Sequence, residues 1–487
     1  MSPTRALDYA CRHRDRFIDE LCAFVRIPSV SAQPVHSRDV RACGIWLAEK
    51  LRDAGLERVV VVPTHGHPAV LGEWRHAPGR PTILIYGYYD VQPADPLTDW
   101  RSPPFEPQVR GENLYGRGAS DDKGQLWAHV KAIESSLRGA GALPVNVVCL
   151  FEGEEEIGST NLEVVLNSQR DVIQADGAVL SDTRILGPDR PAITYSLRGK
   201  LAFELELRGA AHDVHSGSFG GAVHNPAQAL CELIADLHDA RGRIVIPGLY
   251  DRVRAWSGAE RAQMARSGPD DARILRDARA LGGWGEHGYT LHERTTIRPS
   301  LVVSSVWAGY QGPGGKAIIP ARASAKVCLR LVPDQNPQEI ERLIRRHLDR
   351  VTPPTVHLSL RVMSAAGPAQ MNRHHPLTRA ARFAYHKAFG RPPVFLRSGG
   401  TIPLVGTLQA RLRVPTVLMG FALPDDRMHA PNEKFHLPTF SRAIETILWF
   451  FTRIGRQDVT DWSSLQTLSE NPENPTLAIR RRPTRSP

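Results

Sequence analysis

Short apolar runs of strand length alternate with amphipathic stretches in the first part of this sequence, and this alternation constrains the fold more than any other feature. Four apolar runs are predicted strands: 58–62, 82–86, 145–151 and 178–180. The stretch 40–51 has one apolar helical face, and Gly55 is the expected end of that helix. Another helix is expected to begin near Lys123 and to end at Gly139. Such an order predicts an α/β fold with parallel strands.

The middle of the chain has a different order of elements. Its expected elements are a strand at 201–207, a helix at 226–237, strands at 301–306 and 323–332, and a helix at 337–348. The succession of strand, helix, strand, strand and helix predicts a compact α+β insertion.

The last third returns to the first pattern, with a strand at 416–419 between helices at 377–389 and 438–454. We therefore expect an α/β domain that is split by the insertion and has a mixed, mostly parallel sheet. The expected division is 1–192 and 369–458 for the split domain, 193–368 for the insertion, and 459–487 for a polar, Pro-rich, mobile tail.

The basic excess of the chain does not indicate a nucleic-acid-binding protein. Lys and Arg number 61 against 51 Asp and Glu, so the formal net charge is +10. Arg alternates with Asp and Glu along 339–350, as on a solvated helix face, and the densest basic cluster lies in the tail at 480–485. No run of roughly 18 uncharged apolar residues occurs, so we expect no membrane span.

The six cysteines are scattered singly, without a CxxC pair. This pattern argues against a disulfide framework and against a thiolate zinc site. The N-terminal segment is charged and has no apolar core of the kind that marks a secretory signal. A cytoplasmic location is therefore expected.

Acidic residues follow the predicted strands. Asp90, the segment 152–156 and Asp182 each come directly after one, His429 comes shortly after the strand at 416–419, and Asp121 precedes a helix. In an open α/β sheet, ligands bind beyond the carboxyl ends of the strands, so these side chains are expected to converge. Converging carboxylates repel one another by roughly several kcal/mol, and a bound cation removes that repulsion. Oxygen ligands with a histidine and no thiolate favour Zn, Mn or Co.

Each of these elements also has an ordinary structural interpretation. An acidic run such as 152–156 is commonly a solvated loop, a single histidine is commonly packed or exposed, and acids before a helix commonly interact with its dipole. Their shared position after successive strands favours the metal site.

Several segments in the same order resemble the M20 family of metallopeptidases, and the dipeptidase branch related to carnosinase fits best. The segments are GYYDVQP (87–93), GRGASDDKGQ (116–125), EGEEEIGS (152–159), HSGSFGG (215–221), IPARASAKVCLRLVPDQ (319–335) and GGTIP (399–403). The resemblance implies a catalytic α/β domain interrupted by a smaller, ferredoxin-like α+β lid that also forms a homodimer. It implies a metal-dependent hydrolase of amide bonds in dipeptides or related N-acyl amino acids, with one or two ions per chain.

The resemblance also assigns roles to individual residues. Asp121 would bridge two metals, Glu156 and His429 would complete the first site, and Asp182 would bind the second. Glu155 would be the general base, and Asp90 would support the site. His215 would stabilise the oxyanion in the partner subunit, Arg330 would bind the substrate carboxylate, and Thr401 would lie beside it.

The sequence departs from the family pattern at one metal ligand. The family motif reads Gly-His-x-Asp, whereas this chain has Gly87-Tyr88-Tyr89-Asp90. A phenol at position 88 is expected to reach into the second metal position, because its oxygen lies further from the backbone than an imidazole nitrogen, and to leave that site weakened or empty. Ala317 and Ser398 likewise replace a hydroxyl and an acid. These changes motivate an alternative, a non-hydrolytic binding protein or a repurposed biosynthetic enzyme.

Overall fold

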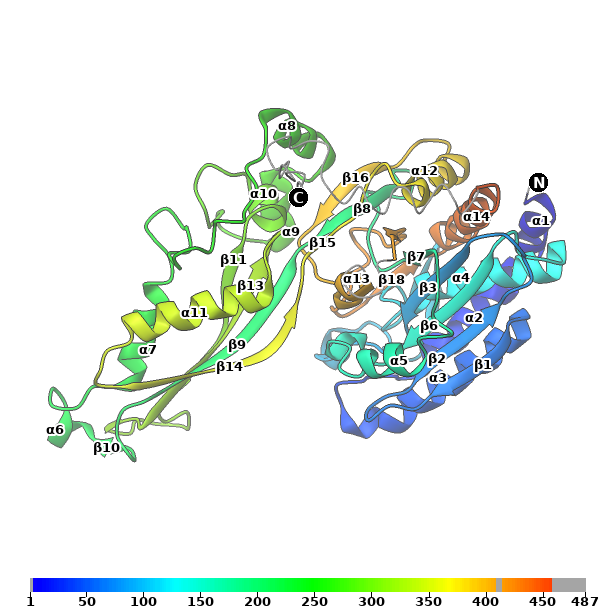
Figure 1. The fold of residues 1–487 in the computed structure, drawn as a ribbon. Coiled ribbons are helices and arrows are strands. Elements are labelled where there is room, and N and C mark those ends of the chain that lie inside the picture. The colour runs from blue at the N-terminus through cyan, green and yellow to red at the C-terminus, as the bar shows by residue number, and fades with distance from the viewer. Residues whose placement is uncertain (1–2, 409–413, 458–487) are drawn as a thin grey trace, which may run out of the picture.

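A nine-stranded mixed sheet forms the core of one of two lobes in the computed structural model, which describes residues 3–408 and 414–457 (Figure 1). The strand order is β1-β2-β6-β3-β7-β17-β8-β15, and β16 pairs with β8. The strands are β1 (Glu57–Val62), β2 (Ala69–Trp74), β3 (Thr82–Tyr88), β6 (Asn146–Glu152), β7 (Gly177–Leu180), β8 (Ala192–Leu197), β15 (Ala369–Gln370), β16 (Val394–Ser398) and β17 (Thr416–Leu418).

Parallel pairing is concentrated at the centre of this sheet. Strands β6, β3, β7 and β17 are parallel neighbours, and β16 is parallel to β8. The pairs β1–β2, β2–β6, β17–β8 and β8–β15 are antiparallel. The predicted α/β class is confirmed, but parallel and antiparallel pairs are equally frequent. The short connection of residues 63–68 explains the antiparallel pair β1–β2, because parallel neighbours need a long crossover.

Helices cover both faces of the nine-stranded sheet, since alternate strand residues point to opposite faces (Figure 1). Ile83 and Ile85 of β3 belong to an apolar core with α1 (Thr4–Arg12), α2 (Arg14–Arg26), α3 (Ser37–Ala54), α4 (Lys123–Glu134), α12 (Pro376–Phe389) and α14 (Leu437–Ile454). Leu84 and Tyr88 belong to a second core with α5 (Leu162–Ser168) and α13 (Pro403–Thr407). Strand β3 is consequently buried along its whole length.

Of two predicted helix ends, the one at Gly55 is confirmed and the one at Gly139 is wrong. Helix α3 is followed by Gly55 at φ 102°, the left-handed conformation expected of a terminal glycine. The prediction that the next helix ends at Gly139 is wrong, because α4 continues into a π-helical segment, Ser135–Ala140, and the left-handed residue is Gly141. A Cβ at Gly139 would lie 2.6 Å from the Tyr9 side chain, so close packing against α1 explains this glycine instead.

A four-stranded antiparallel sheet of order β11-β13-β9-β14 forms the second lobe (Figure 1). Its strands are β9 (Gly199–Arg208), β11 (Ser300–Ala308), β13 (Arg322–Leu331) and β14 (His357–Ala366). Helices α7 (Pro226–Ala235) and α11 (Pro337–Val351) pack on this sheet, and their apolar residues share its core. The sequence analysis missed β14, although Leu358, Leu360 and Val362 alternate as strand residues do.

The chain passes between the lobes twice, from β8 into β9 at Arg198 and from β14 into β15. The remaining elements are short. They are α6 (Ser216–Phe219), α8 (Gly258–Ser267), α9 (Asp271–Ala278), α10 (Leu291–Thr296), β4 (Gln108–Arg110), β5 (Asn113–Tyr115), β10 (Val214–His215), β12 (Ile318–Ile319), β18 (Lys434–His436), and the turns η1 (Pro34–His36), η2 (Leu97–Asp99) and η4 (Glu155–Ile157). The predicted mobile tail, 459–487, lies outside the described residues.

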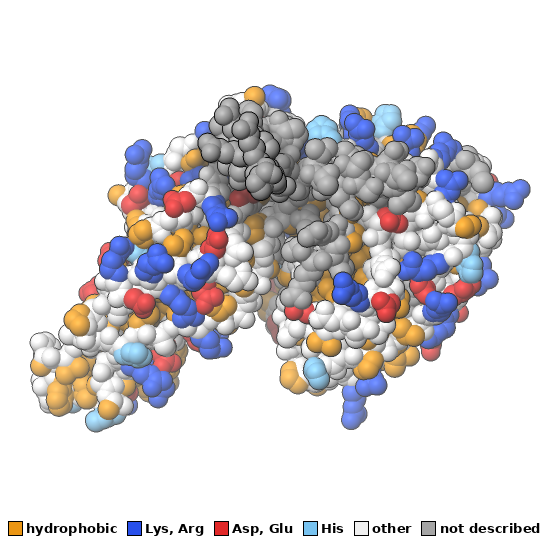
Figure 2. Space-filling view, viewed as in Figure 1, with side chains coloured by type: hydrophobic (Ala, Val, Ile, Leu, Met, Phe, Trp, Pro, Cys, Tyr) orange, Lys and Arg blue, Asp and Glu red, His pale blue; other side chains and the backbone are white. Residues whose placement is uncertain are grey.

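The surface shown in Figure 2 mixes Lys and Arg with Asp and Glu over both lobes. The basic side chains do not gather into a stripe on this face. No helix in the described part of the chain is long and apolar enough to cross a membrane.

Gly124, the second residue of α4, gives a test of the packing beside the carboxyl edge of the sheet. A Cβ here would lie 2.1 Å from the Ala119 carbonyl oxygen and 2.5 Å from the Phe435 ring. Replacing a helical glycine by alanine ordinarily stabilises by about 0.5–1 kcal/mol. We expect Gly124→Ala instead to destabilise by about 1–3 kcal/mol through overpacking, which thermal unfolding would measure as a lower midpoint.

Gly258, the first residue of α8, is the matched control. A Cβ at this position has no neighbour within 4 Å, so Gly258→Ala should leave the midpoint unchanged or raise it. Equal effects of the two substitutions would contradict the close approach at Gly124.

Candidate metal centre

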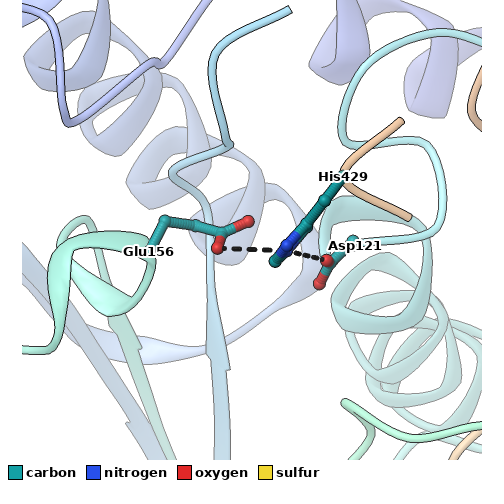
Figure 3. Close-up of side chains that lie close together, drawn as sticks. All are labelled: Asp121, Glu156 and His429. Carbon is teal, nitrogen blue, oxygen red and sulfur yellow. Dashed lines mark ion pairs between the residues drawn. The ribbon is translucent and has the colours of Figure 1, made fainter. Parts of the chain in front are cut away.

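Three predicted ligands meet at the carboxyl edge of the nine-stranded sheet (Figure 3). Asp121 lies in the loop before α4, Glu156 lies in the turn after β6, and His429 lies in the loop between β17 and β18. His429 Nε2 is 2.8 Å from Asp121 Oδ2 and 3.3 Å from Glu156 Oε2. Within residues 3–408 and 414–457, this is the one group of three acidic, His or Cys residues whose ligand atoms lie within 4.8 Å of one another.

Glu433 fixes the loop that carries Asp121. Its buried carboxylate accepts hydrogen bonds from the backbone N–H groups of Gly118, Ser120 and Asp121, at 2.9–3.0 Å. It also accepts a bond of 2.7 Å from Arg117 Nη1, and both side chains are at most 1% exposed. Breaking such a buried pair typically costs about 3–5 kcal/mol, so Glu433 holds Asp121 firmly in place.

Asp90 fixes the turn that carries Glu155 and Glu156. Its Oδ1 accepts from the Glu155 N–H at 3.2 Å, and its Oδ2 accepts from the Glu156 N–H at 3.1 Å. Gln92 Nε2 donates to Glu156 Oε2 at 2.8 Å. Asp90 therefore orients the turn on which Glu155 and Glu156 lie.

His429 has a left-handed backbone, with φ 63°. Non-glycine residues in this conformation are uncommon and cluster at functional sites. The loop is closed by a hydrogen bond of 3.0 Å from the Ala430 N–H to the Arg427 carbonyl and by another of 3.0 Å from the Lys434 N–H to the Asp426 carbonyl. This closure directs the partly exposed imidazole toward the two carboxylates.

Burial and mutual repulsion govern the charges of the site. Burial, followed by the charges of Asp121 and Glu156, raises the pKa of Asp182 well above its usual range. Burial, followed by the charges of Asp182 and Glu156, does the same to the pKa of Glu155. Hydrogen bonds to Asp121 and Glu156 raise the pKa of His429 to about 10.

These residues fit a divalent cation. The two carboxylates and the imidazole supply O, O and N donors, a set that suits zinc, manganese or cobalt. Glu156 Oε1 is buried and has no hydrogen-bond partner, although buried polar atoms are normally paired. A cation beside this oxygen would satisfy it and would remove the repulsion that raises the pKa of the neighbouring acids.

The Tyr88 hydroxyl contacts two predicted ligands. It donates a hydrogen bond to Asp121 Oδ1 at 2.5 Å, and its bond to Asp182 opposes the rise in the pKa of that carboxyl. Burial and the charges of Asp121 and Asp182 raise the pKa of Tyr88 well above 10, so the phenol keeps its proton at neutral pH. The phenol is thus directed at Asp121, the residue predicted to bridge two metals.

The other candidate residues fall into two places. Arg330 Nη1 donates to Thr401 Oγ1 at 2.8 Å, so the structure brings together the two residues expected at the substrate carboxylate. His215 lies on β10 at the far tip of the second lobe, remote from the three ligands of its own chain (Figure 1).

Sequence reasoning gave no role to Glu433 or Gln92. Glu433 lies four residues after His429, in the polar stretch after the last strand of the sheet. An acid so close to a candidate ligand was a signal, but its acceptor role depends on a loop 312 residues earlier.

Comparison with known proteins gives consistent results. The sequence matches peptidase family M20/M25/M40 over residues 84–452. It is 31% identical to the Cys-Gly metallodipeptidase dug1 of Schizosaccharomyces pombe, over 91% of this chain and 97% of that protein. These matches confirm the resemblance that the motifs indicated.

Two solved structures extend the match to the fold. Human carnosine dipeptidase 1 has a TM-score of 0.81 and 29% identity, over 93% of this chain and 99% of that one. The M20 family metallo-carboxypeptidase Sso-CP2 from Sulfolobus solfataricus has a TM-score of 0.82 and 30% identity, over 91% and 99%. Both lobes of the present chain are thus part of the shared fold.

The raised pKa values predict how metal-free stability depends on pH. Burial raises the pKa of Glu152 and of Glu433 to about 7, and His429 has a pKa of about 10. A group whose pKa is higher folded than unfolded loses its stabilising contribution as pH rises through the folded value. We expect the thermal midpoint of EDTA-treated protein to fall by several degrees as pH rises from about 5 to 8.5, through the two acids below about pH 7 and through His429 above about pH 6.5.

Added Zn²⁺ or Mn²⁺ should raise that midpoint, and more at the higher pH, because bound ligands must be deprotonated. His429→Ala is expected to abolish the metal-induced rise, whereas His374→Ala, at an exposed histidine, should retain it. A midpoint that climbs with pH in EDTA, or a rise retained in His429→Ala, would contradict the assignment.

Proposed function

The chain belongs to peptidase family M20/M25/M40 and is a metal-dependent hydrolase of amide bonds, and we propose the roles of its residues from that premise. The observation that carries the proposal is the group of Asp121, Glu156 and His429 beside the carboxyl of Glu155. The non-hydrolytic alternative suggested by Tyr88, Ala317 and Ser398 is not favoured, since the relatives reported above are named as peptidases.

We infer that Asp121, Glu156 and His429 hold a divalent ion, with Zn²⁺, Mn²⁺ or Co²⁺ as the candidates. When bound, such an ion polarises a carbonyl and makes water more acidic. Glu433 and Asp90 contribute by fixing the loops that carry the ligands. The partly exposed His429 closes the site on its solvent side.

Glu155 is the proposed general base. Its carboxyl lies close enough to Asp182 and Glu156 for their charges to raise its pKa, and burial raises it further. A carboxyl with a raised pKa takes a proton from the attacking water more readily than an ordinary one, and can return it to the leaving amine. Proton transfer by a positioned side chain contributes roughly 10²–10⁴-fold to a rate.

The proposed substrates are dipeptides or N-acyl amino acids with a free carboxylate. Arg330 offers a guanidinium, which suits bidentate binding of a carboxylate, and Thr401 orients it through the hydrogen bond of 2.8 Å. The Thr401 hydroxyl in turn donates to the Arg198 carbonyl at 2.7 Å, which ties the pair to the crossing between the lobes. Cys-Gly and β-Ala-His are the substrates named for relatives and are suitable first trials.

We further propose that the second lobe forms a lid and dimerisation domain, and that His215 acts in the site of the partner subunit. This lobe runs from β9 to β14, residues 199–366, because β8 belongs to the nine-stranded sheet and the expected start at 193 is too early. His215 is exposed at the tip of its lobe, where it has no access to the ligands of its own chain (Figure 1). Trp307, Val302 and Val306 of the edge strand β11 are about half exposed, which suits contact with a second copy. The six unpaired cysteines favour a reducing compartment, such as the cytoplasm.

Glu155→Gln separates the general base from the metal site. The substitution preserves shape but removes proton transfer, so we expect kcat for Cys-Gly hydrolysis to fall by about 10²–10⁴-fold. Metal content, measured by elemental analysis on the same samples, should match the wild type. Glu163→Gln, at an exposed acid of α5, is the control and should leave both values unchanged. Retention of activity in Glu155→Gln would remove Glu155 as the base.

His215→Ala tests catalysis across subunits. We expect a loss of about 10²–10³-fold in kcat, the usual effect of removing an oxyanion donor, with dimer formation unchanged in size-exclusion chromatography. Mixing this variant with Glu155→Gln should restore part of the activity, because one site of the mixed dimer then has both intact residues. The absence of any recovery in confirmed mixed dimers would contradict a role across subunits.

A further inference from the structure

The Tyr88 side chain is held rigidly at the carboxyl end of β3. Its ring is 2% exposed and belongs to the apolar core that contains Leu84, Leu150 and Leu180. Tyr88 pairs with Glu152 of β6 in the parallel ladder, and its backbone N–H bonds to the Asp122 carboxylate. Because the ring and the backbone are both fixed, the hydroxyl has little freedom to move away from its acceptors.

The two oxygens of the Asp121 carboxylate lie in different environments, because the Tyr88 hydroxyl bonds to only one of them. Asp121 Oδ1 accepts from Tyr88 at 2.5 Å, while Oδ2 faces His429 Nε2 at 2.8 Å. Asp182 lies on the Tyr88 side, where it also bonds to the hydroxyl. The described group of three converging ligand atoms accordingly includes Glu156 and His429 but not Asp182.

We propose that this chain binds one divalent ion, held by Asp121, Glu156 and His429, and that the Tyr88 hydroxyl bridges Asp121 and Asp182 in place of a second ion. Tyr88 is then a positioning residue, because it acts through Asp121, and Asp182 is a hydrogen-bond partner of the phenol oxygen instead of a metal ligand. The inference rests on the proposed metal site and specifies how many ions it holds.

Space and donor chemistry both support this inference. A zinc ion bound by Asp121 Oδ1 and Asp182 would need oxygens at about 2.0–2.2 Å. The phenol oxygen already lies 2.5 Å from Asp121 Oδ1, and its hydrogen points at the lone pairs that such an ion would use. An ion and the hydroxyl hydrogen therefore compete for the same oxygen, Asp121 Oδ1. The buried ring blocks retreat of the hydroxyl, so the hydroxyl is favoured.

The hydrogen bond also has a role in the remaining site. Partners of this kind orient metal ligands, and their removal typically costs about 10–100-fold in metal affinity. By holding Oδ1, Tyr88 keeps Oδ2 directed at His429. Tyr88→Phe should therefore weaken binding of the single ion without changing its stoichiometry.

Metal stoichiometry of apoprotein titrated with Co²⁺, followed by visible absorption and by elemental analysis after gel filtration, tests the proposal directly. We expect one ion per chain in the wild type and in Asp182→Asn. Tyr88→His, which supplies an imidazole and removes the phenol, should bind two. Two ions in the wild type, a fall in stoichiometry in Asp182→Asn, or a single ion in folded Tyr88→His would each overturn the proposal.

Tyr86→Phe is the matched control for Tyr88→Phe. Tyr86 lies two residues earlier on the same strand, is equally buried, and donates to Glu152 instead of to a proposed ligand. We expect Tyr88→Phe to raise the Kd for Co²⁺ about 10–100-fold and Tyr86→Phe to leave it within about threefold. Equal effects of the two substitutions on the Kd for Co²⁺ would contradict a specific role of the Tyr88 hydroxyl and would leave Tyr88 with a role in packing alone.

These outcomes are separate from those that bear on the proposed function. A wild type that binds no ion, or that retains binding in His429→Ala, contradicts the proposed metal site itself. A wild type that hydrolyses dipeptides with two ions contradicts only the role of Tyr88.

Discussion

Mutual repulsion among buried acids at the carboxyl edge of the nine-stranded sheet governs the arrangement of the candidate metal centre. Asp182, Glu155 and Glu156 all have a raised pKa because burial and neighbouring negative charges disfavour their ionised forms. Parallel strands create this situation, since their carboxyl ends meet at one edge. The fold accommodates this density of charge because Glu433 and Asp90 accept hydrogen bonds from N–H donors, while Asp121 and Glu156 face His429 and the proposed cation.

The two uses of carboxylates are separated cleanly in space. The carboxylates of Glu433 and Asp90 accept hydrogen bonds from backbone N–H groups of the loops before α4 and after β6. These hydrogen bonds make the two loops rigid. Asp121 and Glu156 lie on those loops and keep oxygens directed at His429. Positional precision in the ligands thus comes from acids that are not ligands, which explains why a site built on loops can be ordered.

Sequence patterns predicted the features that depend on neighbouring residues or on a shared sheet edge. They failed where the role of a residue depends on a partner far away in the sequence. Apolar periodicity located the central strands, and the shared edge of parallel strands was sufficient to bring Asp121, Glu156 and His429 together. The same reasoning misplaced the end of α4, because Gly139 is required by contact with Tyr9 on another helix and not by a turn. Glu433 was missed for a related reason, since its acceptor role exists only once a loop from the first part of the chain packs against it.

At Tyr88 the sequence departs from the family pattern, so the effect of a hydroxyl on Asp121 and Asp182 must be compared with that of a cation. A cation between Asp121 and Asp182 would neutralise two charges, whereas a hydroxyl only supplies a donor, so the substitution should leave Asp182 short of compensation. The raised pKa of Asp182 agrees with this shortfall, because burial and the charges of Asp121 and Glu156 disfavour its ionised form. In the proposed arrangement the phenol therefore occupies one side of Asp121, and the other side faces His429 and is reserved for the ion.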